Sequence, residues 1–122
     1  MMIISKVMVP ESVKDGQGTL LRRNGKVVAY ERGSVANVYI FHEDTEEGTR
    51  AMELKVPIPI TRAKCINAAE MAAYGLNDAM DVASFASSLS RKERKGEDIE
   101  EVQEHDAFIG EVKEELTALG IL

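Results

Sequence analysis

The chain is poor in the residues that build most covalent, metal and redox sites. Its 122 residues include one cysteine, two histidines, three prolines and no tryptophan, and only 5% are aromatic. The single cysteine, Cys65, excludes an internal disulfide and a zinc site made of several cysteines. We therefore expect a protein of a reducing compartment that is stabilised by packing alone.

Long apolar runs are also missing. No stretch approaches the roughly 20 consecutive apolar residues of a membrane-spanning helix. The apolar start, residues 1–4, is followed by Lys6 and lacks the order of regions seen in a secretory signal. We expect a cytoplasmic protein with no membrane partner.

The negative charge is concentrated at one end of the chain. The net charge is −6, but residues 1–96 hold 14 Lys and Arg against 12 Asp and Glu, whereas residues 97–122 hold one Lys against nine acids. Nucleic-acid affinity comes largely from Lys and Arg that neutralise phosphates. The acidic composition thus argues against nucleic-acid binding as the main function.

Sequence motifs of catalysis are absent. The chain has no Gly-x-Gly-x-x-Gly, no nucleotide-binding glycine loop, no Gly-x-Ser-x-Gly and no His-Glu-x-x-His. The acidic residues 43–47 lack the spacing of a calcium loop and predict a solvated hairpin loop. A reactive Cys65 at a helix start, with His42 or His105 as its base, is a third interpretation of the function. We predict no enzyme activity, no metal site and no cofactor.

The first sixty residues have the patterns of β-strands. Residues 3–9 are rich in Ile and Val and predict a first strand. Residues 35–42 are apolar on both faces, which is typical of a central strand. Residues 52–60 alternate with period two, but prolines at 57 and 59 cannot donate to a sheet. That strand is predicted to end near Val56 or to continue as an extended edge.

A tight hairpin is the clearest local signal in this half. The pair Asn24-Gly25 lies between residues 19–23 and 26–32, and both turn residues tolerate positive φ. Two-residue hairpin geometry predicts that Leu21 lies opposite Val28.

The remaining residues, 61–122, have the signals of three helices. Thr61 is a predicted N-cap of the first helix, and Gly75 is a predicted stop for it. Asn77 is the predicted cap of the second helix, which ends in a run of cations. Asp98 is the predicted cap of the third, and Gly120 followed by Ile121 is its predicted stop.

The third helix has an apolar stripe whose partner the sequence leaves open. The stripe would fold back on the sheet or meet a helix of another protein, and its residues are Val102, His105, Ile109, Val112, Leu116 and Leu119. His105 is expected to be an ordinary core or interface histidine. Gly110 costs about 1 kcal/mol relative to Ala inside a helix, which indicates close packing against a neighbour.

Strands first and helices second predict one α+β domain over residues 1–122. An antiparallel sheet of four or five strands would come from residues 1–60 and three helices from residues 61–122. We expect a non-catalytic interaction or assembly module, homo-oligomeric or bound to another protein. It would be an accessory or structural component of a larger complex, such as one carried by a phage or mobile element.

The alternative function is binding of nucleic acid or another polyanion. Two basic clusters support it, one at the hairpin tip and one at the end of the second helix: Arg22, Arg23 and Lys26, and Arg91, Lys92, Arg94 and Lys95. If the two clusters converge in space, they make one anion-binding patch. Otherwise they are an exposed turn and a helix end charged to suit its dipole.

Overall fold

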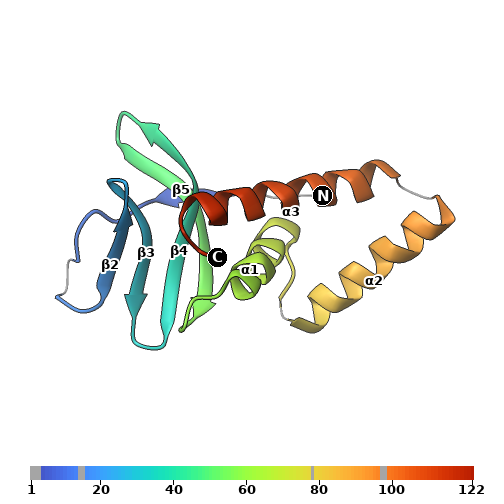
Figure 1. The fold of residues 1–122 in the computed structure, drawn as a ribbon, viewed down its shortest axis with the longest axis horizontal. Helices are drawn as coiled ribbons and strands as arrows, with labels where there is room; N and C mark the ends of the chain where they lie inside the picture. Colours follow the sequence, from blue (N-terminus) through green and yellow to red (C-terminus); the bar gives the residue numbers. More distant parts are fainter. Residues whose placement is uncertain (1–3, 14–15, 78, 97–98) are drawn as a thin grey trace.

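The computed structural model describes residues 4–13, 16–77, 79–96 and 99–122, and its fold is the α+β arrangement predicted from the sequence (Figure 1). The elements in chain order are β1 (Lys6–Met8), β2 (Thr19–Arg23), β3 (Lys26–Arg32), β4 (Val35–Thr45), β5 (Gly48–Pro57), α1 (Arg62–Tyr74), α2 (Ala79–Lys95) and α3 (Ile99–Ala118). None of the helices within the described residues is both long enough and apolar enough to cross a membrane.

The five strands form one antiparallel sheet in the order β1-β5-β4-β3-β2. The predicted central strand is confirmed, because β4 lies between β5 and β3. The predicted end of the last strand is also confirmed, since β5 stops at Pro57. The first strand is shorter than its sequence indicates: β1 covers three residues, and part of the predicted range lies outside the described residues.

The Asn-Gly hairpin between β2 and β3 is present, and Arg23 lies opposite Lys26 as two-residue geometry predicts, but the predicted register farther from the turn is wrong. Asn24 and Gly25 have φ angles of 53° and 78°, as the tight turn requires. Leu21 lies opposite Ala29 instead of Val28, because a bulge shifts the pairing by one residue just beyond the turn. The turn determines only the pairs next to it.

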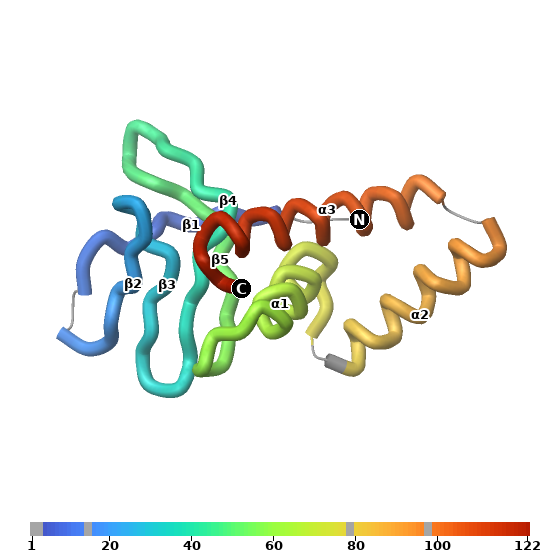
Figure 2. Tube along the Cα trace, in the orientation of Figure 1, coloured from blue at the N-terminus to red at the C-terminus, as the bar shows by residue number. Residues whose placement is uncertain are grey.

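The main core lies between one face of the sheet and the helices α1 and α3 (Figures 1 and 2). Its largest fully buried side chain is Phe108, which is 2% exposed. The predicted stripe of α3 omits Phe108 and includes Ile109, which is only partly buried. The buried side of α3 thus includes Phe108, and α3 contacts both α1 and strand β4.

Both ends of α1 are as the sequence predicts. The Oγ1 atom of Thr61 accepts a hydrogen bond from the backbone N–H of Lys64 at 3.2 Å. At the other end Gly75 has a φ of 68°, and the N–H of Leu76 donates to the carbonyl of Met71 at 2.9 Å. This is the hydrogen bond of a Schellman motif, which satisfies carbonyls at the helix end.

The end of α3 is confirmed, whereas the packing expected of its glycine is not found. The N–H of Ile121 donates to the carbonyl of Leu116 at 2.8 Å, and Gly120 has a φ of 82°. Among the described residues, a Cβ atom added to Gly110 would meet no neighbour within 4 Å, so the predicted close packing against a neighbour is not found there. Asp98, the predicted cap, lies outside the described residues.

The other face of the sheet carries a smaller apolar cluster. It contains Val9, Val27, Tyr39 and Ala51. The hydroxyl of Tyr39 donates to Oε2 of Glu53 at 3.2 Å, and burial together with this carboxylate raises the pKa of Tyr39 strongly. Figure 1 shows α1 and α3 on the other side of the sheet, so this smaller cluster is formed by side chains of the strands and by Val9, which follows β1.

Candidate functional site

Helix α2 lies on the far side of α1 and α3 from the sheet, and its C-terminal end lies near the start of α3 (Figures 1 and 2). It follows Gly75, and the N–H of Asn77 donates to Oδ2 of Asp81 at 2.9 Å. The predicted cap Asn77 thus contributes its backbone, while residue 78 lies outside the described residues. Three cations in the last turn suit the negative end of the helix dipole.

One face of α2 attaches it to the other two helices. The ring of Phe85 lies 4.7 Å from the ring of Tyr74 on α1 and 5.5 Å from that of His105 on α3. Leu89 is buried on the same side. One turn further on, Lys92 Nζ contacts Oε2 of Glu101 on α3 at 3.0 Å. We call this side the α2 inner face.

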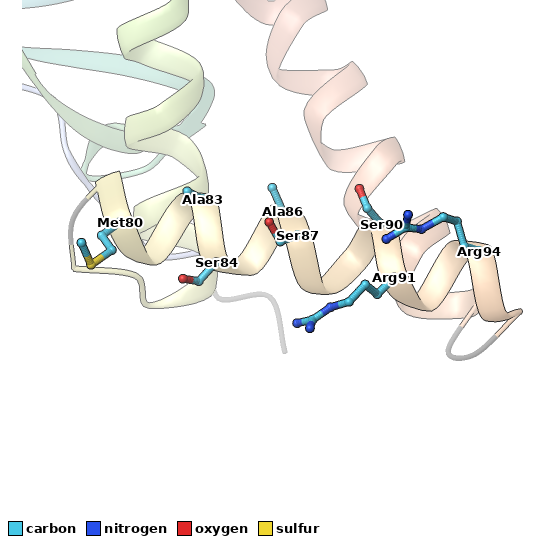
Figure 3. A pocket seen from close by; sticks show the side chains of 8 residues that line it. All are labelled: Met80, Ala83, Ser84, Ala86, Ser87, Ser90, Arg91 and Arg94. Atoms are coloured by element: carbon cyan, nitrogen blue, oxygen red, sulfur yellow. The ribbon is translucent and has the colours of Figure 1, made fainter.

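The opposite side, the α2 outer face, is a long exposed surface with mostly small side chains. It borders a shallow groove of about 600 Å³ and consists of Met80, Ala83, Ser84, Ala86, Ser87, Ser90, Arg91 and Arg94 (Figure 3). Met80, near the start of the helix, is 78% exposed. The two arginines lie near its end, so the face changes from apolar and small to basic along the helix.

The apolar stripe of α3 packs within its own chain. Val112 and Leu116 are fully buried in the main core, Val102 is buried, and Ile109 and Leu119 pack against that core. Of the two possibilities that the sequence leaves open, folding back on the sheet is the one found. The stripe is covered, and a surface for a partner has to lie elsewhere.

His105 lies where α1, α2 and α3 meet. Its Nε2 is 3.6 Å from Oε1 of Glu70, which is too long for a hydrogen bond, and its ring is 5.6 Å from that of Tyr74. Among the described residues, His105 Nε2, Glu70 Oε2 and the Tyr74 hydroxyl are buried without hydrogen-bond partners. Burial raises the pKa of Tyr74, and nearby carboxylates raise it further. This junction orients α2 on the body of the molecule.

No family model, no curated protein and no solved structure matches this chain. Its function is therefore inferred from its own geometry.

The two predicted basic clusters do not converge. The turn between β2 and β3 and the C-terminal end of α2 lie at opposite ends of the molecule (Figures 1 and 2). Two of the cations are also engaged within the chain: Arg22 Nη2 donates to the carbonyl of Glu11 at 2.5 Å, and Lys92 pairs with Glu101. The seven cations thus do not form a single anion-binding surface.

The surroundings of Cys65 do not favour a nucleophile, and those of the acidic residues 43–47 do not favour a metal site. Cys65 is fully buried in the main core, and burial raises the pKa of its thiol, whereas a nucleophile needs a lowered one. The acidic residues 43–47 form the end of the β4–β5 hairpin, where Glu43 pairs with Lys6 at 3.1 Å. Within the described part of the chain, no group of three His, Cys, Asp or Glu side chains is placed to hold a metal ion.

A strained bulge in β4 is a feature that the sequence does not indicate. Phe41 has a φ of 56°, which a bulky residue rarely adopts, and the pairing with β5 shifts between Ile40 and Glu43. Within this bulge the side chain of His42 is 3% exposed, and its Nε2 forms a hydrogen bond with the Val27 carbonyl at 2.9 Å. Phenylalanine and histidine are ordinary strand residues, so no local pattern marks this position.

Glu115 of α3 holds the bulge from the helix side. Its Oε1 accepts a hydrogen bond from the backbone N–H of Phe41 at 3.0 Å and lies 4.0 Å from Nδ1 of His42. The carboxylate thus satisfies a backbone donor that the bulge removes from the strand pairing. We assign this arrangement a structural role, since it fastens α3 to the sheet.

Proposed function

We propose that this protein is a non-catalytic assembly module that forms homo-oligomers and serves as a structural or accessory component of a larger complex. The observation that carries the proposal is the α2 outer face. Helix α2 packs on α1 and α3 through its inner face only, and its outer face is exposed along the length of the helix.

The composition of this face supports protein contact better than small-molecule binding. Its groove is open and shallow, whereas small-molecule sites are usually concave and enclose the ligand. Small side chains allow another helix to approach closely, since interaxial distance depends on the residues at the contact. The inner face keeps α2 in place through Phe85, Leu89 and Lys92, so a partner would meet an ordered surface.

Native mass spectrometry of the purified chain over a concentration series tests this function. We expect a discrete oligomer that carries no ligand, with the oligomer fraction rising with concentration. A chain that is monomeric at every concentration would overturn the proposal. Retention of a metal ion, a nucleotide or a nucleic-acid fragment would overturn it as well, and retained nucleic acid would favour the alternative based on the basic clusters.

A further inference from the structure

Helix α3 also has an exposed face, and this face contains Gly110, a glycine that packing within one chain does not require. On α3, the side turned away from the sheet carries Gln103, Ala107, Gly110, Glu111 and Glu114, all of them exposed. We call it the α3 outer face. Glycine inside a helix costs about 1 kcal/mol relative to alanine. Within the described residues nothing lies near the missing Cβ of Gly110, so packing inside the chain does not require a glycine there.

The two outer faces have complementary charge. The α2 outer face carries Arg91 and Arg94, and the α3 outer face carries Glu111 and Glu114. Neither glutamate forms an ion pair with the part of the chain that the structure describes. Each face also has small residues beside its charges, so that two helix backbones can come close enough for the arginines to reach the carboxylates.

These faces cannot meet within one chain. The pair formed by Lys92 and Glu101 and the contact between Phe85 and His105 join the inner sides of α2 and α3. The outer faces therefore point away from each other. A contact between them has to involve two molecules.

We propose that the α2 outer face of one copy binds the α3 outer face of a second copy. This inference rests on the proposed homo-oligomeric function and names the two surfaces that would carry it. The contact is heterologous, since two different patches meet, and it closes into a dimer only if both molecules exchange it reciprocally. Gly110 then lies at the crossing point, where a larger side chain would hold the helices apart.

Charge reversal tests the pairing of these two faces. Arg91→Glu with Arg94→Glu gives two like-charged faces, as does Glu111→Lys with Glu114→Lys. By sedimentation equilibrium we expect each double variant alone to raise the dissociation constant by about 10- to 100-fold. An equimolar mixture of the two double variants restores complementary charges at both contacts and is expected to regain wild-type affinity.

The matched control is Lys26→Glu with Lys55→Glu, which changes the charge equally at two exposed positions of the sheet. We expect this control to associate like the wild type. The inference would be overturned if the arginine variant associated like the wild type, or if the mixture of the two double variants stayed dissociated. In either case an oligomeric wild type would still support the proposed function. A wild type that is monomeric throughout would overturn both.

Gly110→Leu separates association from folding. Because the space around Gly110 is open and leucine is the better helix former, the variant is expected to unfold at a higher temperature than the wild type when both are monomeric. At the same time it is expected to associate at least about 10-fold more weakly, since the side chain blocks close approach. Unchanged association of a folded Gly110→Leu chain would contradict a contact across this position.

Discussion

Replacing Tyr74 by phenylalanine is expected to stabilise the protein, whereas the same replacement at Tyr39 is expected to destabilise it. The two hydroxyls differ in their partners. The hydroxyl of Tyr74 is buried and has no hydrogen-bond partner among the described residues. The hydroxyl of Tyr39 donates to the carboxylate of Glu53 at 3.2 Å, and Tyr39 is 2% exposed.

The magnitudes follow from the cost of an unpaired group and the value of a charged hydrogen bond. An unsatisfied buried hydroxyl costs roughly 1–3 kcal/mol, so Tyr74→Phe is expected to raise the free energy of unfolding by about 1 kcal/mol. A hydrogen bond to a charged acceptor contributes about 1.5–3 kcal/mol. Tyr39→Phe is therefore expected to lower the free energy of unfolding by about 2 kcal/mol.

Urea denaturation at neutral pH, at a concentration where all variants are in the same oligomeric state, measures both changes. The expected result is midpoints displaced in opposite directions from the wild type with unchanged slopes. Equal destabilisation by both substitutions would refute the reasoning, because it would mean that the Tyr74 hydroxyl contributes as much as one with a charged partner.

Tyr74 also makes the free energy of unfolding depend on pH at alkaline pH. Burial raises the pKa of Tyr74 above its ordinary value of 10.0, so the unfolded chain loses the phenolic proton first as the pH rises. The stability due to the neutral phenol is complete below about pH 10 and is lost as the pH rises through the pKa of the folded state. The Tyr74→Phe variant is expected to lose less stability than the wild type between pH 9 and 11, roughly one unit either side of that ordinary value. A variant that loses as much as the wild type would contradict the burial of this hydroxyl.

Three further changes test the core, the cysteine and the first helix. Phe108→Ala is expected to lower the free energy of unfolding by about 3–5 kcal/mol in urea denaturation, since it removes the largest fully buried side chain of the main core; a loss below 1 kcal/mol would be inconsistent with that burial. Cys65 is expected to react with iodoacetamide much more slowly than a free cysteine at neutral pH, and rapid labelling of the folded chain would rule out its buried position. Thr61→Ala is expected to cost about 1 kcal/mol and Thr61→Ser much less in thermal unfolding; equal losses would exclude the capping hydroxyl as the cause.

The features that the sequence predicts well depend on neighbouring residues. The Asn24-Gly25 turn, the cap at Thr61 and the helix stops at Gly75 and Gly120 each need only a few consecutive residues to form their hydrogen bonds. The order of strands and helices follows from the same local preferences. These interactions act over four or five residues, so their signals are present in the chain before it folds.

The candidate site could be predicted only in part. The small residues and arginines of α2 are visible in the sequence, and the arginines belong to a predicted basic cluster. Periodicity indicates that α2 has two faces, but it does not show that Phe85 and Leu89 would be covered by α1 and α3 while Met80 stays exposed. Which side of α2 is covered depends on where α1 and α3 lie in the folded chain.

Features that depend on local patterns differ in their predictability from features that depend on contacts between distant residues. Sequence patterns alone predicted the α+β class, the element order, both ends of α1 and the C-terminal end of α3, since these depend on local hydrogen bonds and hydrophobic periodicity. Four features are not indicated by the sequence: the bulge at Phe41, the burial of Phe108, the separation of the two basic clusters and the open space at Gly110. Each of these depends on how residues tens of positions apart pack together, and packing in three dimensions leaves no periodic signal along the chain.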